Sequence, residues 1–149
     1  MRGTWDDVNR RLVGSLLALD LEDKLIIRER VARPRRRLFG RTPAAPPHRW
    51  AAVTAQQSLL LAECVGAERH GGPWPVDEAT EARLKRSGWQ PPWSDEFAEY
   101  TLERPLIQAP EVAVAVARAL RDLGCQVEDL EVELTREEPD PGDYGGEAW

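Results

Sequence analysis

The sequence contains no long hydrophobic run, and its amino terminus lacks the basic start and apolar core of a secretory signal peptide. No stretch approaches the roughly 18 consecutive apolar residues that a membrane-spanning helix requires. These absences argue against a secreted or membrane-embedded protein. We therefore predict a cytoplasmic protein with no membrane partner.

Cysteine and histidine, which often bind metals or act as nucleophiles and bases, are scarce. Cys64 and Cys125 lie far apart and near apolar residues, which favours buried free thiols. A disulfide would require the two backbones to meet, and the sequence does not decide that. Neither His48 nor His70 stands at zinc-ligand spacing or beside a Ser, a Cys or a carboxylate pair. Because glycine-rich phosphate loops are also missing, we predict no catalytic residues, no metal site and no cofactor.

Charge is distributed unevenly along the chain, whose net charge is −6. Basic residues dominate from Lys24 to Arg41, and acidic residues dominate after Glu128. The prolines of residues 33–47 predict an exposed loop, and the consecutive Arg35, Arg36 and Arg37 within it are a candidate anion-binding site. No aromatic residues interleave with these arginines and the protein is acidic, so a nucleic-acid partner is disfavoured. A solvated loop attracted to the acidic tail, residues 137–149, is the favoured alternative, and this tail is predicted to be disordered.

Hydrophobic periodicity predicts three helices and five strands. Apolar residues at three- and four-residue steps indicate helices, and alternating apolar residues indicate strands. The predicted helices are Trp5 to about Asp20, Glu78–Ser87 and Pro110 to Gly124, and the predicted strands are Lys24–Val31, a hairpin His48–Val65 that breaks at Gln56–Ser58, Phe97–Glu103 and Leu130–Leu134.

This order of segments predicts an α+β fold. We expect a mostly antiparallel sheet of about five strands, with two long helices and one short helix on one face. Residues 1–136 are expected to form a single domain, since 149 residues are enough for one domain of ordinary size.

Six tryptophans in one small protein raise the question of a binding surface, because Trp is enriched in interface hot spots. For Trp5 and Trp89 we expect a place in the core. For Trp74 and Trp93, which neighbour prolines, core and surface remain equally open. The residues that we consider candidates for a protein-binding surface are Trp50, Leu59, Leu61 and Trp93.

The order of the motifs resembles the actinobacterial TY-Chap domain, which is related to YbjN and to type III secretion chaperones. The resemblance rests on Arg49-Trp50 in the first hairpin strand, Ser87-Gly88-Trp89 with Pro91 soon after, and Ala119–Leu123 in the late helix. It covers about Trp5 to Leu134. The chain departs from the family pattern at Trp50, where Tyr is usual, and at its end, which leaves the pairing of the last strand open. The resemblance implies a type III secretion chaperone-like sandwich that is not an enzyme.

Together these observations predict a chaperone-like or adaptor protein that binds another polypeptide along a strand edge or in an apolar groove. A homodimer would cover any sheet face that the helices leave bare. The alternative is a nucleic-acid-associated regulatory protein that uses the Arg33–Arg41 loop.

Overall fold

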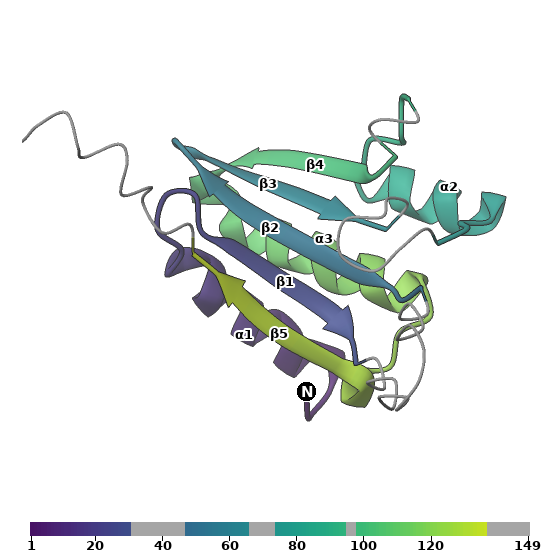
Figure 1. The fold of residues 1–149 in the computed structure, drawn as a ribbon, viewed down its shortest axis with the longest axis horizontal. Coiled ribbons are helices and arrows are strands. Elements are labelled where there is room, and N and C mark those ends of the chain that lie inside the picture. Colours follow the sequence, from purple (N-terminus) through teal and green to yellow (C-terminus); the bar gives the residue numbers. More distant parts are fainter. Residues whose placement is uncertain (31–46, 66–73, 95–97, 137–149) are drawn as a thin grey trace, which may run out of the picture.

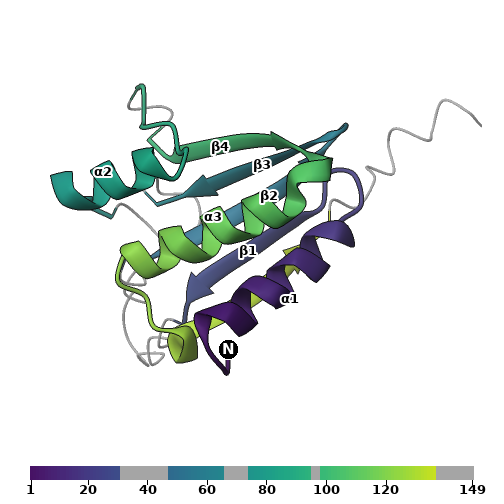
Figure 2. The same ribbon diagram turned by 180° about the vertical axis from the view of Figure 1, so that it is seen from behind.

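Two long helices lie on one face of an antiparallel sheet, and a shorter helix flanks them near one edge strand (Figures 1 and 2). A computed structural model of the protein describes residues 1–30, 47–65, 74–94 and 98–136. The arrangement confirms the predicted α+β class, with five strands and three α-helices in the described part of the chain.

The first helix, α1 (Trp5–Leu17), begins at a capping box, in which Thr4 and Asp7 each bind the other's backbone N–H. Its buried face consists of Val8, Leu12 and Leu16, which recur at the spacing of one helix face. The helix ends about one turn before the expected Asp20, and Glu22 then adopts a left-handed conformation with φ of 69°. This tight connection leads directly into the first strand.

The sheet contains β1 (Lys24–Glu29), β2 (Trp50–Gln56), β3 (Leu59–Cys64), β4 (Tyr100–Pro105) and β5 (Leu130–Thr135), in the order β4-β3-β2-β1-β5. All neighbouring strands are antiparallel. The predicted hairpin is confirmed as β2 and β3, which turn at Gln57 and Ser58. The structure also settles the last strand, because β5 pairs with β1 with Val132 opposite Ile27.

The two remaining α-helices are α2 (Glu78–Arg86) and α3 (Ala109–Asp122), each with local signals at its ends. Asp77 caps α2 by accepting a hydrogen bond from the Thr80 N–H at 2.7 Å. After α2, Gly88 takes a φ of 99°, a conformation that glycine adopts readily at a helix end. Short 3₁₀ turns precede α3 and β5, at Leu106–Gln108 and Val127–Asp129.

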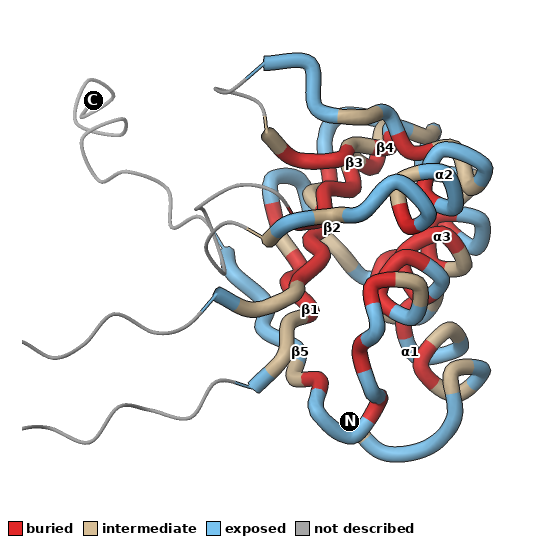
Figure 3. Tube along the Cα trace, turned by 90° about the vertical axis from the view of Figure 1, so that its right-hand side faces the viewer, coloured by how far each residue is buried: buried red, intermediate tan, exposed pale blue. Residues whose placement is uncertain are grey.

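The main core lies between the sheet and the helices, as the edge-on view in Figure 3 shows. The alanines of α3 let this helix approach the sheet closely, and Trp89 is buried there as expected, while Trp5 packs against the core only partly buried. The fourth strand begins at Tyr100, which stands opposite Cys64 of β3, and Phe97, where we expected it to begin, lies outside the described residues. The predicted loop with Arg35, Arg36 and Arg37 and the acidic tail lie outside the described residues.

Candidate functional site

The helix-free face of the sheet is the first surface that could receive a partner. In β2 and β3 the residues of the main core alternate with a second set that must point away from the helices. This second set includes three of the predicted surface residues, Trp50, Leu59 and Leu61. The structure therefore places these three of the four candidate residues on the sheet face opposite the helices.

Trp50 does not lie at the surface of that face. Its side chain is fully buried and forms a small cluster with Ile26 and Ala52, which stand beside it on β1 and β2. The cluster lies on the sheet face opposite the one that packs against the helices, because its residues alternate with those of the main core. Trp50 is thus a buried residue of the helix-free face, and the half-buried Leu59 and Leu61 are the members of the predicted set that are partly exposed on it.

Ion pairs connect β1 to β5 and to β3 across the helix-free face. Arg28 binds Glu131 at 3.1 Å and Glu133 at 2.9 Å, so that one guanidinium joins β1 to two carboxylates of β5. Lys24 lies 4.0 Å from Glu63 and spans β2. These pairs neutralise the part of the face near β1 and leave its apolar surface near the hairpin end of β3.

The hairpin end of β3 adjoins further apolar side chains. Leu59 stands opposite Pro105 of β4, and the Leu106 N–H donates to the Ser58 carbonyl at 3.0 Å. Next in sequence, Ile107 is 89% exposed. An apolar corner thus forms where β3, β4 and the following 3₁₀ turn meet.

The two edges of the sheet differ in their capacity to accept another strand. On β4, Thr101 exchanges two backbone hydrogen bonds with Gln90, at 2.7 and 3.1 Å, and Pro105 has no N–H to donate. On β5, none of the strands in the described segments pairs with the outer side. This open edge also exposes Val132 by 43% and Leu134 by 45%. The Met1 ammonium binds the Leu130 carbonyl at one end of this edge, so the stretch at Val132 and Leu134 is the more accessible template for an extended peptide.

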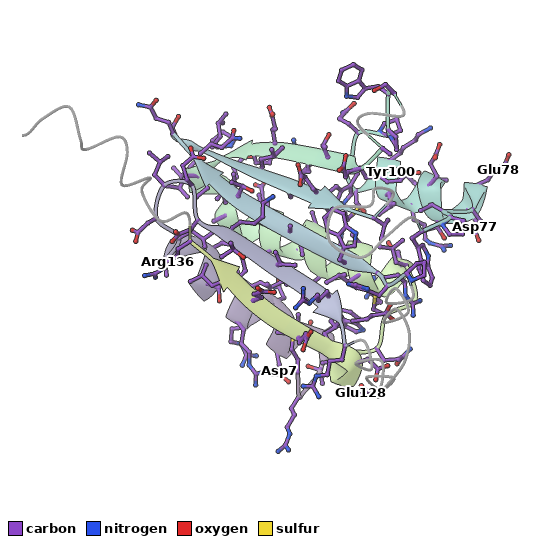
Figure 4. All side chains as sticks on the ribbon, viewed as in Figure 1. Asp7, Asp77, Glu78, Tyr100, Glu128 and Arg136 are labelled. Atoms are coloured by element: carbon purple, nitrogen blue, oxygen red, sulfur yellow. The ribbon has the colours of Figure 1, made fainter. Side chains whose placement is uncertain are left out.

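More apolar side chains lie at the same end of the fold as Leu134. Leu17 and Leu21 are each 62% exposed and belong to the end of α1 and the connection to β1. Leu134 stands opposite Leu25 near the start of β1, and Arg136 just beyond is 3.8 Å from Asp23 (Figure 4). The sequence did not predict this edge. Leu130, Val132 and Leu134 alternate in the same way, so all three are expected to be buried, but the helices cover only Leu130.

Trp93, the fourth predicted surface residue, lies apart from the other three. It is 74% exposed and lines a hollow of about 420 Å³ together with Trp74, Pro92 and Tyr100. Tyr100 donates a hydrogen bond of 2.5 Å to Glu81 of α2, and burial together with this bond raises the pKa of the Tyr100 phenol (Figure 4). The structure therefore does not bring the predicted set into one site.

Arg49 makes contacts with three separate parts of the fold. It forms a salt bridge with Glu29, donates to the Leu123 carbonyl at the end of α3 at 2.8 Å, and lies 4.9 Å from the Trp74 ring. Burial raises the pKa of Glu29, but the hydrogen bonds from the Arg49 side chain and backbone overcome this, so that the pKa falls below its usual value. Arg49 is thus a structural link among β1, β2 and α3.

Cys64 and Cys125 are free and buried, as predicted. Burial raises the pKa of both thiols, that of Cys125 to about 12. Within the described ranges, no group of three or more His, Cys, Asp or Glu side chains is placed to hold a metal ion. None of the helices in those ranges is long and apolar enough to cross a membrane.

Comparison with known proteins identifies one family. A family model described as "TY-Chap3: T3SS (YopN, CesT) and YbjN peptide-binding chaperone 3" matches residues 1–135. No curated protein and no solved structure matches the chain.

Proposed function

Because the chain belongs to the TY-Chap3 family of peptide-binding chaperones, we propose that it is a non-enzymatic cytoplasmic chaperone that holds an extended segment of another polypeptide. The observation that carries this proposal is the open edge of β5. A client segment would add there as a sixth strand that pairs with the outer side of β5. Main-chain hydrogen bonds would supply affinity that depends little on client sequence, which suits a chaperone.

Apolar side chains at the edge would give such a client its second source of affinity. Val132 and Leu134 point toward the helix side of the sheet, as their opposite residues Ile27 and Leu25 do. Every second side chain of the client would point to the same side and contact them. A segment that alternates apolar and polar residues therefore fits this edge best.

The proposal is tested by comparing two pairs of substitutions that place lysines on different surfaces. Val132→Lys with Leu134→Lys alters the β5 edge, and Leu59→Lys with Leu61→Lys alters the helix-free face. Binding of a labelled, uncharged alternating peptide of about ten residues is measured by fluorescence anisotropy. We expect the edge pair to weaken binding about tenfold or more and the face pair to leave it within about twofold.

Two results would contradict the proposed binding mode. If no uncharged peptide binds the unaltered protein, the chaperone function fails. If only the face pair weakens binding, the client lies on the helix-free face, where Leu59, Leu61 and the underlying Trp50 stand. Circular dichroism of both variants confirms that each remains folded.

The proposal also includes a homodimer that covers the apolar corner at Leu59, Leu61 and Ile107. Large exposed apolar patches commonly mark contacts between proteins, and a two-fold axis would place this corner against its own copy. Sedimentation velocity at micromolar concentration should then show a dimer, and Leu61→Glu should convert it to monomer. A monomer at all concentrations would remove this part of the proposal. Trp93, in its separate hollow, remains a proposed contact for a protein partner.

A further inference from the structure

Four arginines gather between α2 and α3, on the helical side of the molecule. Arg83 and Arg86 come from the last turns of α2, and Arg118 and Arg121 come from the outer face of α3. Together they line one hollow of about 410 Å³. Figure 2 shows the two helices side by side on this face of the molecule.

Most of the positive charge in this arginine hollow has no partner within the described residues. Arg83 lies 3.9 Å from Asp122, the one carboxylate that lines the hollow. No other carboxylate in the described segments lies within ion-pair distance of Arg86, Arg118 or Arg121. Four guanidinium groups against one carboxylate create a local positive potential on a chain whose net charge is −6.

Helix ends alone do not explain the cluster. Basic residues in the last turn stabilise a helix by interacting with its dipole, which accounts for Arg83, Arg86 and Arg121. Arg118 lies a turn earlier, at the point where three neighbouring hollows meet. The two adjoining hollows are lined by the apolar Val114, Ala115 and Ala117, which form their floor, and also by the polar Glu111, Asp6 and Asn9.

We infer that this arginine hollow binds an acidic segment of a partner polypeptide, in which carboxylates alternate with apolar residues. The carboxylates would pair with the guanidinium groups, which match carboxylate geometry through two parallel hydrogen bonds. The apolar residues would contact the floor at Val114, Ala115 and Ala117. A nucleic acid fits less well, because its many phosphates would be repelled by the acidic remainder of the protein. This inference rests on the proposed peptide-binding function but uses a different surface from the β5 edge.

The test uses the folded full chain and a labelled peptide of about ten residues in which Glu alternates with Leu, together with its Gln-for-Glu counterpart. The unaltered protein should bind the acidic peptide about tenfold more tightly, and the difference should shrink when the salt concentration rises from about 0.05 M to about 0.5 M. Replacing Arg118→Gln with Arg121→Gln should reduce affinity for the acidic peptide about tenfold. The same variant should bind the uncharged alternating peptide unchanged.

A matched control removes two exposed arginines elsewhere. Arg10→Gln with Arg11→Gln, two exposed positions of α1, makes the same change in net charge, and it should alter the affinity for the acidic peptide less than about twofold. Equal effects of the two pairs would overturn the inference, as would equal binding of the Glu and Gln peptides. Tighter binding of an oligonucleotide of the same charge would also overturn it, by assigning the hollow to nucleic acid. The uncharged peptide reports on the β5 edge. If the unaltered protein does not bind this peptide, the proposed function is rejected, whatever the result for the arginine hollow.

Discussion

Replacement of Arg49 by Met should destabilise the protein more than loss of any single exposed charge. The Arg49 and Glu29 side chains are only 22% and 15% exposed, so removal of the guanidinium leaves a carboxylate with little access to water. The change also removes the hydrogen bond to the Leu123 carbonyl at 2.8 Å and the contact with the Trp74 ring. Hydrogen bonds to charged groups contribute about 1.5–3 kcal/mol each, and partial hydration of the pair offsets part of their loss. We expect the free energy of unfolding to fall by about 2–4 kcal/mol.

The loss of stability caused by Arg49→Met should become smaller as the pH falls. The folded-state pKa of Glu29 is lowered from 4.5, so its stabilising contribution is complete above that pH and is lost as the pH falls through the folded-state pKa. In the Met variant the side-chain hydrogen bonds and the charge of Arg49 are lost, while the backbone N–H of residue 49 still donates to Glu29, so burial raises the pKa of Glu29 above its value in the unaltered protein. The difference in stability between the two proteins should therefore narrow as the pH falls from 7 to below 4.5.

Urea denaturation followed by circular dichroism, at several pH values, measures this difference directly. Arg10→Met is a suitable control, since the Arg10 side chain is 79% exposed and its one ion pair lies at the surface. A loss below about 1 kcal/mol for Arg49→Met at pH 7 would refute the reasoning. So would a difference that stays constant across the pH range.

Three further predictions concern the core, the hairpin and the thiols. Leu12→Ala should lower the free energy of unfolding by about 2–5 kcal/mol, because Leu12 is buried in the main core. Leu17→Ala, at an exposed position of the same helix, should change it by less than about 0.5 kcal/mol. Equal effects of the two substitutions in urea denaturation would contradict this packing of α1. Ser58→Gly should raise the free energy of unfolding by about 0.5 kcal/mol, because Ser58 has a φ of 62° in the hairpin turn; a loss of stability would exclude this turn geometry. Both cysteines should resist a thiol-specific reagent at pH 8 until urea is added, since burial raises the pKa of each; rapid modification of the native protein would contradict their placement.

Several features of the fold were predictable because their signals are local. Thr4 with Asp7, Asp77, and Gly88 mark helix ends through contacts within a few residues, and the period of apolar residues identifies helix and strand. Boundaries were less accurate where a distant partner decided them. The fourth strand was expected to end at Glu103 and extends to Pro105, which stands opposite Leu59 of β3.

The candidate surfaces depended on tertiary structure to a greater extent. The sequence named Trp50, Leu59, Leu61 and Trp93 as candidates together, but only the packed structure buries Trp50 and separates Trp93 from the other three. The arginine hollow combines α2 with residues of α3 that lie more than thirty positions later, and no motif connects them in the sequence.

The sequence by itself determined the secondary structure, the α+β class and the family resemblance, since each follows from short-range periodicity, capping and the order of motifs. Only the tertiary structure decided that the last strand pairs with the first and so becomes an open edge of the sheet. The physical reason is that strand order and surface exposure depend on contacts between residues as far apart as Arg28 and Glu131, whose hydrogen bond at 3.1 Å no local pattern specifies.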